Sequence, residues 1–268
     1  MLDGLPLRGE RLTLPRPTRA WSARRPLKRW RYVGVYGPDA MLCAADVAIA
    51  GLGQQFWAVW DRTQLRERTV IRPTRPRPVS VPDGRLVVRD GEVEVDLALV
   101  DDGEAVEVAS PHGRSFIWTR KQPVRARGTV RLAGREIAVD APGLIDDSAG
   151  YHARNTAWEW SAGGGTSAAG ERVVWNLVTG VHDGAQVSER TVWVDGVARA
   201  VAPVAFSPAL DAVGGLRFAE EARRARRDEL LVFASDYVQP FGSFSGSLPG
   251  GVELRDGFGV MERHTARW

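Results

Sequence analysis

The strongest constraint on this chain is the alternation of apolar and polar residues in short segments separated by turn-forming residues. Between Val93 and Leu99 every second residue is valine or leucine. The residues between them are Glu94, Asp96 and an alanine. A period of two brings the apolar side chains to one face of a strand and the charged side chains to the other. Similar runs recur through residues 31–268, with Gly, Pro and Asp between them. The pattern predicts an all-β fold of antiparallel strands.

The number and even spacing of these strands favour β-barrels, because closure of a sheet removes its exposed edges. A chain of 268 residues can form one large β domain or two small ones. We expect an N-terminal arm over residues 1–30 and two barrels over residues 31–140 and 141–268, and we leave open an exchange of strands across the boundary. Residues 219–231 (AEEARRARRDELL) are expected to form one short helix, since their acidic residues precede the basic ones. Residues 162–171 (AGGGTSAAGE) are expected to form a hairpin tip.

Composition narrows the classes of function. Cys43 is the single cysteine, which excludes an internal disulfide and a cysteine-based zinc site. Four histidines without HxH or HExxH spacing make a weak metal signal, so neither a metal nor another cofactor is expected. Acidic residues are interspersed with the arginines, and this favours a solvated surface over a nucleic-acid interface. With no long apolar run and no signal-peptide core, the sequence predicts a cytoplasmic protein without a membrane-spanning segment.

The densest group of reactive side chains lies between Gly143 and Gly163. It contains two adjacent carboxylates, a Tyr-His pair, an arginine and two tryptophans at alternate positions: Asp146, Asp147, Tyr151, His152, Arg154, Trp158 and Trp160. Gly143 and Gly150 are expected to bracket a loop that holds the two carboxylates. Trp175 and Asn176 lie on a following strand and point to its opposite faces.

The carboxylates and the histidine could act in acid-base catalysis, and these residues and the tryptophans could equally have purely structural roles. An aspartic acid that is desolvated at an apolar barrel mouth has a raised pKa and can act as a general acid. A histidine titrates at a useful pH. The alternative is that the carboxylates accept backbone N–H bonds in a turn and that the tryptophans fill the core. Glu189 and Arg190 are adjacent, and we expect a simple pair at the surface.

Several segments resemble a bacterial family known only as domain of unknown function 2804. The matching segments run from about Arg31 to Trp268 and include RYVGVYGPDAMLCAADVAI, QQFWAVWDR, GLIDDSAGYHARNTAWEWSAG and QPFGSFSGSLPGGVELRDGFGVMERHTARW. A carboxylate-bearing segment before a Trp-x-Trp strand is also similar to the lipocalin-like group of carotenoid hydratases and related cyclases. That group looks like two calycin barrels side by side. Its motif places Trp or Phe before the Asp and His after it, whereas Ile145 and Asp147 flank Asp146 here, so the resemblance transfers only one aspartate, Asp146 or Asp147.

The residues and the resemblance together predict two lipocalin-like barrels that bind an apolar or amphipathic small molecule. The candidate catalytic residues are Asp146, Asp147 and His152. The candidate ligand-binding residues are Tyr151, Arg154, Trp158, Trp160, Trp175 and Asn176. Two alternatives stay open: an enzyme for acid-initiated hydration, cyclisation or isomerisation, and a structural or interaction module with filled barrels. The sequence leaves open the oligomeric state and whether the two halves share one pocket.

Overall fold

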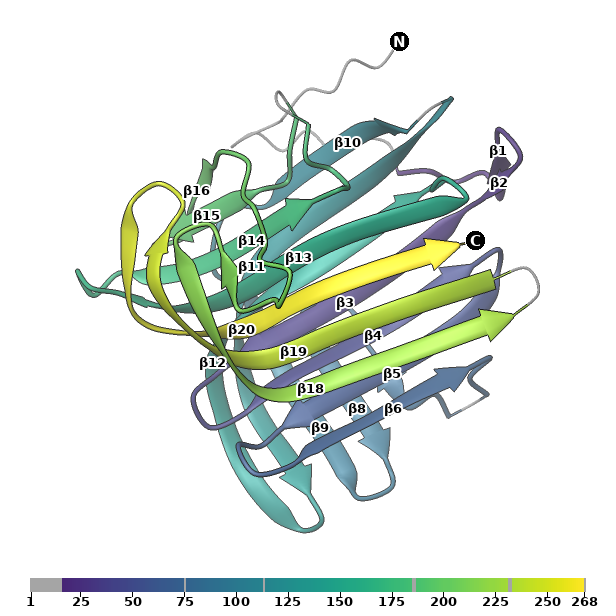
Figure 1. Ribbon diagram of the computed structural model, residues 1–268. Helices are drawn as coiled ribbons and strands as arrows, with labels where there is room; N and C mark the ends of the chain where they lie inside the picture. Colours follow the sequence, from purple (N-terminus) through teal and green to yellow (C-terminus); the bar gives the residue numbers. More distant parts are fainter. Residues whose placement is uncertain (1–15, 75, 113, 185–186, 231–232, 268) are drawn as a thin grey trace.

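The computed structural model describes residues 16–74, 76–112, 114–184, 187–230 and 233–267, and within these ranges every regular element is a β-strand. The all-β prediction is therefore confirmed. Neighbouring strands are antiparallel and form two curled sheets, an arrangement consistent with two lipocalin-like barrels (Figure 1). No helix in the described ranges is long and apolar enough to cross a membrane.

The first sheet has ten strands in the order β6-β5-β4-β3-β12-β11-β9-β8-β7, and β10 pairs with the N-terminal part of β11. Its strands are β3 (Lys28–Tyr36), β4 (Met41–Ile49), β5 (Leu52–Trp60), β6 (Leu65–Ile71), β7 (Val79–Ser80), β8 (Arg85–Asp90), β9 (Val93–Asp101), β10 (Val106–His112), β11 (Ser115–Leu132) and β12 (Arg135–Gly150). A separate short ribbon precedes it, formed by β1 (Trp21–Ser22) and β2 (Arg25–Pro26).

The second sheet has eight strands in the order β16-β15-β14-β13-β20-β19-β18-β17. Its strands are β13 (Asn155–Ser167), β14 (Arg172–Thr179), β15 (Thr191–Val194), β16 (Val197–Ala200), β17 (Ala212–Val213), β18 (Leu216–Leu230), β19 (Phe233–Leu248) and β20 (Val252–Arg267). The chain passes from one sheet to the other between β12 and β13. The expected domain boundary at residues 140 and 141 falls inside β12, and the division into domains stays a prediction.

Apolar side chains form three clusters, and their positions explain the strand sequences. One cluster belongs to the first sheet, one to the second, and the third lies between the two sheets. On β3, Val33 and Val35 point into the first cluster, whereas Tyr32 and Tyr36 point into the cluster between the sheets. A strand that is buried on both faces needs apolar residues at consecutive positions, so its period of two is hidden. In Figure 1, β18, β19 and β20 lie over β3, β4 and β5.

The predicted helix at residues 219–231 is wrong. Residues 216–230 form β18, which pairs with β19 along its length. Phe218 packs into the cluster of the second sheet, whereas Ala222 and Arg224, which follow a register shift between Glu220 and Ala222, face the first sheet. This β-bulge changes the face to which the even-numbered residues point, and the alanine and arginine at the inward positions after it leave no apolar alternation in the sequence. Pairing and burial on one face outweigh the helix propensity of Ala, Glu and Arg.

The predicted loop between Gly143 and Gly150 is also wrong, because this segment is the second half of β12. It pairs with β3 on one side and β11 on the other, so it lies in the interior of the sheet. Asp146 and Asp147 are therefore consecutive residues of a strand and point to opposite faces.

The predicted hairpin tip at residues 162–171 is only partly right, since its first half belongs to β13. Gly163 and Gly165 pair with both β14 and β20. A Cβ atom on Gly163 would lie 2.1 Å from the Trp175 ring, and one on Gly165 would lie 2.1 Å from the Asp256 carbonyl oxygen. The glycines are needed for close packing here rather than for a turn.

Candidate functional site

A cavity of about 200 Å³ lies between the two sheets. The first sheet lines it with Trp30, Tyr32 and Phe56, and the second sheet lines it with Trp158 and Trp160, among other residues. The Tyr32 and Trp160 rings meet edge to face with their centroids 5.5 Å apart. Both sheets are therefore needed to form this cavity. It is separate from the apolar clusters that lie within each sheet.

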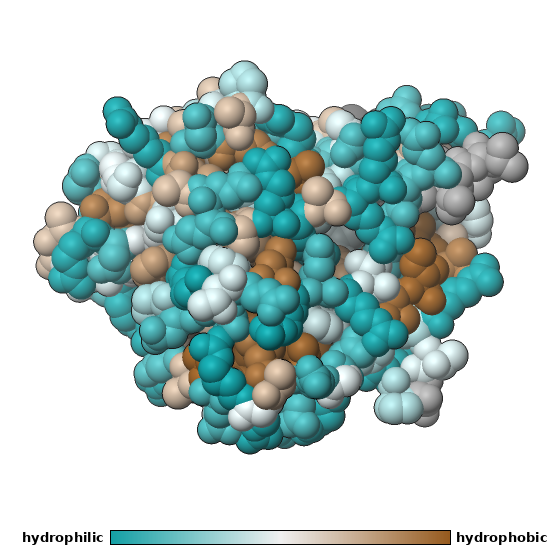
Figure 2. All heavy atoms as spheres, turned by 60° about the horizontal axis from the view of Figure 1, so that its bottom comes forward, coloured by the Kyte–Doolittle hydropathy of each residue, from teal (hydrophilic) through white to brown (hydrophobic). Residues whose placement is uncertain are grey.

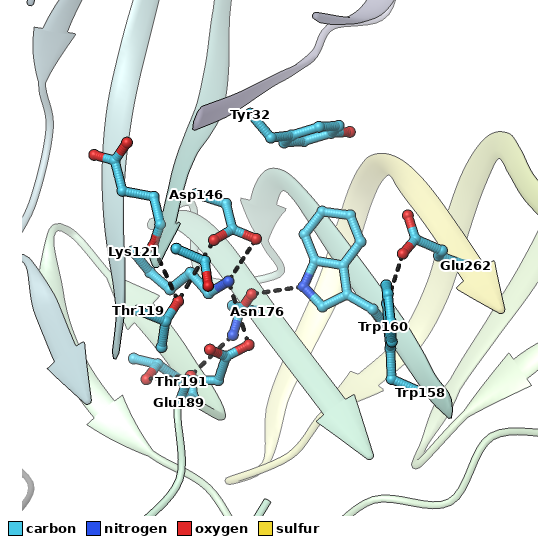
Figure 3. Close-up of polar contacts among 12 residues, drawn as sticks. Tyr32, Thr119, Lys121, Asp146, Trp158, Trp160, Asn176, Glu189, Thr191 and Glu262 are labelled. Atoms are coloured by element: carbon cyan, nitrogen blue, oxygen red, sulfur yellow. Dashed lines mark hydrogen bonds and ion pairs between the residues drawn. The ribbon is translucent and has the colours of Figure 1, made fainter. Parts of the chain in front are cut away.

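One side of the cavity carries a buried group of three charged side chains (Figure 3). Lys121 on β11 lies directly opposite Asp146 on β12, and the Lys121 Nζ is 2.6 Å from Asp146 Oδ2. The same ammonium is 3.3 Å from Glu189 Oε1, in the segment before β15. We call Lys121, Asp146 and Glu189 the buried triad.

The buried triad holds two carboxyl groups but one ammonium. Burial raises the pKa of Asp146, the Lys121 ammonium opposes this, and the Glu189 carboxylate adds to it. The two carboxylates in turn hold the pKa of Lys121 above its ordinary value despite burial. A fully ionised triad would leave a net negative charge in the interior, so the arrangement favours the uptake of one proton.

A third carboxyl group, Glu262 on β20, lines the same cavity. The Trp158 Nε1 donates a hydrogen bond to Glu262 Oε1 at 2.7 Å, and the Gln239 Nε2 donates one to Oε2 at 2.9 Å. Burial raises the pKa of Glu262 to about 7, although these donors favour the carboxylate. Glu262 is thus a buried carboxyl group that is partly protonated near neutral pH.

The histidines at this cavity are uncharged at neutral pH. Burial lowers the pKa of His152 well below its ordinary value, and nearby Lys28 adds to the effect. His152 stacks against Trp30 with ring centroids 5.1 Å apart. Burial also lowers the pKa of His182 to about 3 and that of His264 to about 4. Neutral imidazoles can accept as well as donate hydrogen bonds.

Four of the residues singled out in the sequence line this cavity: Asp146, His152, Trp158 and Trp160. Asn176 lies behind the wall and holds two parts of the site together. Its Oδ1 accepts a hydrogen bond from Trp160 Nε1 at 2.7 Å, and its Nδ2 donates one to the Glu189 carbonyl at 2.9 Å.

The other four residues singled out in the sequence do not line the cavity. Asp147 faces the opposite side of β12, where its carboxylate is 3.7 Å from Arg31 and 3.8 Å from Arg16 beside a second cavity of about 890 Å³. The Tyr151 hydroxyl donates to the Arg19 carbonyl at 2.7 Å. Arg154 is exposed. Trp175 is buried in the cluster of the second sheet, 5.0 Å from Phe244 between ring centroids.

Sequence reasoning missed Lys121, Glu189 and Glu262. The expected surface pair is wrong, because Glu189 and Arg190 are both buried. One signal was available: among 36 basic residues only Lys28 and Lys121 are lysines, and both are buried. A compact ammonium suits a buried site with separate carboxylate partners, whereas guanidinium groups dominate the surface here. For Glu262 no comparable signal exists, because its partners come from distant strands.

Among the described residues no group of three or more His, Cys, Asp or Glu side chains could hold a metal ion. On the face shown in Figure 2, hydrophilic side chains cover most of the surface, and hydrophobic ones lie in recesses between them.

Comparison with known proteins identifies the family and leaves the activity open. No curated protein matches the chain. Similar solved structures include kievitone hydratase from Nectria haematococca (8% identity, 88% of each chain covered, TM-score 0.47). They also include an AttH-like protein from Nitrosomonas europaea (14% identity, 89% of this chain and 92% of that chain, TM-score 0.45) and CghA (11% identity, 98% of each chain, TM-score 0.43). Similarity at this level says nothing about the activity of this chain. Residues 79–268 match a family model, and the chain belongs to the family described as Domain of unknown function (DUF2804).

Proposed function

We propose that this protein binds a small, largely apolar molecule with a polar end in the cavity between its two sheets. The observation that carries this proposal is the contrast within one cavity: aromatic walls from both sheets enclose a space of about 200 Å³ that also contacts buried charged groups. Binding sites for small molecules are typically apolar, with a few polar groups that orient the ligand.

The aromatic walls would hold the apolar body of the ligand. Trp30, Phe56, Trp158 and Trp160 line the space, and aromatic side chains gain most when a ligand removes their faces from water. The polar end would contact the triad residues Lys121 and Asp146 or the opposite carboxyl group, Glu262. A molecule with polar groups at one or both ends fits this arrangement better than a pure hydrocarbon, which would leave the charged groups without water.

The test uses Prodan, an uncharged naphthyl ketone that fluoresces strongly in apolar sites. We expect Prodan to bind the full-length protein and to quench tryptophan fluorescence. Trp160→Phe should weaken this binding about tenfold, since an anchoring aromatic wall is lost. Trp175→Phe is the matched control: Trp175 is also buried and also donates its indole N–H to a side chain, but it does not line the cavity. Equal weakening by both variants, or no binding by the wild type, would refute the proposal.

A second candidate function is an enzyme that starts a hydration, cyclisation or isomerisation by protonating an apolar substrate. The observation in its favour is the buried triad, in which two carboxyl groups share one ammonium and one of them can hold a proton beside an apolar space. The test incubates the protein with an extract of apolar metabolites from its host and follows the mixture by mass spectrometry. The wild type should convert a compound, whereas Asp146→Asn should bind Prodan and leave the mixture unchanged. Conversion by both proteins would remove Asp146 from the reaction.

A further inference from the structure

We infer that Glu262 recognises the polar end of the ligand, and that as a neutral carboxylic acid it donates a hydrogen bond to a carbonyl or other acceptor oxygen of an uncharged ligand. This inference rests on the proposed binding function and names the class of ligand. Glu262 lies on β20, in the wall of the cavity that β13, β19 and β20 form.

Every polar partner of Glu262 in the described part of the chain is a hydrogen-bond donor. Trp158 Nε1 donates at 2.7 Å, and an indole nitrogen can only donate. Gln239 Nε2 donates at 2.9 Å, and the Tyr237 hydroxyl forms a third hydrogen bond. An amide and a hydroxyl can each be donor or acceptor, so the roles of Gln239 and Tyr237 depend on their other neighbours.

Arg224 on β18 decides those two roles. Its Nη1 is 3.5 Å from Gln239 Oε1 and 3.4 Å from the Tyr237 oxygen. Because a guanidinium group can only donate, both oxygens accept from Arg224. The Gln239 NH₂ group is then turned toward Glu262, and we assign the Tyr237 hydroxyl as a second donor because its hydrogen bond to Glu262 favours the carboxylate.

Arg224 itself is held from the first sheet. Its Nε is 3.1 Å from Glu67 Oε2 on β6, and its guanidinium lies 4.5 Å from the centroid of the Phe56 ring. The orientation of the donors around Glu262 therefore depends on the contact between the two sheets. Arg224 is a positioning residue in this network.

A carboxyl group offers four hydrogen-bonding positions, and three are taken by donors. When Glu262 is protonated, its O–H fills the fourth position and needs an acceptor. With Tyr237 assigned as a donor to Glu262, no described partner accepts from this O–H, and we assign its acceptor to the cavity that Glu262 lines. A carbonyl, ether or hydroxyl oxygen of a ligand would complete the set.

The protonation state follows from the surroundings. Burial raises the pKa of Glu262 to about 7, while the donors and the Arg224 charge act in the opposite direction. The titratable groups that face Glu262 come from five neighbouring strands and from β20 itself; they are Tyr32, Tyr36, Cys43, Asp146, Arg224, Tyr237 and His264. Burial keeps the three tyrosines, the cysteine and His264 uncharged at neutral pH.

The same arrangement argues against an anionic ligand. Above about pH 7 Glu262 becomes a carboxylate and would repel a negative charge, and the buried triad on the other side already has more carboxylates than cations. The Arg224 guanidinium also lines the cavity, but it is already paired with Glu67. At lower pH a carboxylate ligand could accept from Glu262, but it would remain close to the acidic triad. An uncharged ligand avoids both costs.

The first experiment measures the proton on the ligand-free protein. Infrared difference spectra should show a protonated carboxyl band that disappears with a midpoint near pH 7 and that is missing in Glu262→Gln. The matched control is Glu253→Gln, which changes an exposed carboxyl on the same strand and should keep the band. Absence of a band with this midpoint in the wild type, or its survival in Glu262→Gln, overturns the inference whatever the protein binds. A band from the proton of the buried triad would be present in both proteins and is not counted.

The second experiment measures the ligand contact with Prodan, whose emission shifts to the red when its carbonyl accepts a hydrogen bond. If only protonated Glu262 is competent, affinity falls about tenfold between about pH 6 and about pH 8. Glu262→Gln should bind without this pH dependence, because an amide can donate but does not titrate in this range. The carboxylate analogue of Prodan should bind more weakly than Prodan throughout.

The outcomes separate the two proposals. Prodan binding that is independent of pH, or that keeps its pH dependence in Glu262→Gln, refutes the role of Glu262 and leaves the binding function intact. Tighter binding above pH 7 would mean that the carboxylate accepts from the ligand, and it would also overturn the inference. If Prodan binds at no pH, both the binding function and the ligand contact fail, while the infrared band shows separately whether Glu262 carries the proton.

Discussion

Lys121 and Asp146 lie directly opposite each other on neighbouring strands, and the ammonium of one is 2.6 Å from the carboxylate of the other. The Lys121 side chain is buried and that of Asp146 is mostly buried, and the ammonium also contacts Glu189. The pair therefore puts charge into the interface between two apolar sheets. A buried charge is tolerated only when it is paired, so each member depends on the others.

We expect Lys121→Met to lower the free energy of unfolding by about 3 kcal/mol, because it leaves two buried carboxylates without a cation. Urea denaturation at neutral pH measures this loss. The loss should shrink at lower pH, where the carboxyl groups take up protons, and adding Asp146→Asn and Glu189→Gln should recover stability. Arg85→Met, which breaks an exposed pair with Asp96, is the control and should have a much smaller effect. An equally small effect of Lys121→Met would mean that the triad is not ionised.

Glu262 makes stability depend on pH in a defined direction. Its pKa is raised from 4.5 to about 7 on folding, so the stability that its proton contributes is present below pH 4.5 and is lost as the pH rises to about 7. His264 acts in the opposite direction over a similar range, since its pKa is lowered from 6.5 to about 4. The two effects overlap in the wild type.

The difference between the wild type and Glu262→Gln isolates the carboxyl group. Between about pH 4.5 and about pH 7 this difference in unfolding free energy should move by about 3 kcal/mol in favour of the variant. Chemical denaturation at a series of pH values measures it. A difference that stays constant with pH would show that Glu262 titrates normally.

Arg224 should set the pKa of Glu262 through its charge. Arg224→Met removes a nearby cation that favours the carboxylate, so the midpoint of the infrared band should move above pH 7. Arg226→Met is the comparison on the same strand, where the guanidinium pairs with Asp228 at 2.6 Å. A midpoint that moves equally in both variants would indicate a general loss of positive charge rather than the specific network.

Gly163 should be required by packing. Gly163→Ala places a Cβ atom 2.1 Å from the Trp175 ring and 2.5 Å from the Phe258 carbonyl oxygen, and neither can move freely. We expect a loss of about 2 kcal/mol in unfolding free energy. Gly53→Ala on β5 is the control, because the nearest atom to its new Cβ is 3.5 Å away. Similar stability of the two variants, measured by thermal unfolding, would show that β13 shifts at little cost.

Some features of this fold follow from local pattern alone. The turn between β11 and β12 is one of them, since Ala133 and Gly134 both have positive φ, as a tight two-residue turn requires. The errors arose where the pattern was interrupted or disguised. In β18 the inward positions after the bulge hold Ala222 and Arg224 instead of large apolar residues, and the glycines of β13 suggested a turn although close packing requires them.

The residues of the candidate site also divide into those that the sequence predicts and those that it does not. Asp146 and Trp160 were found from their residue types, and both line the cavity. Lys121, Glu189 and Glu262 were not found, because each is an ordinary charged residue until its strand is placed. Asp147 was assigned to the site because the expected loop left its side-chain direction open. Trp175 was assigned to it together with Asn176, although the two point to opposite faces of one strand.

The sequence by itself determined the all-β class, because a period of two and the turn residues act over a few neighbouring positions. Only the tertiary structure decided where the cavity lies and which charges line it. The cavity forms between sheets, and its partners are separated along the chain by up to hundreds of residues, as Tyr32 and Glu262 are. Burial shifts the pKa of a carboxyl group only after both sheets have removed its water, and no local segment carries that information.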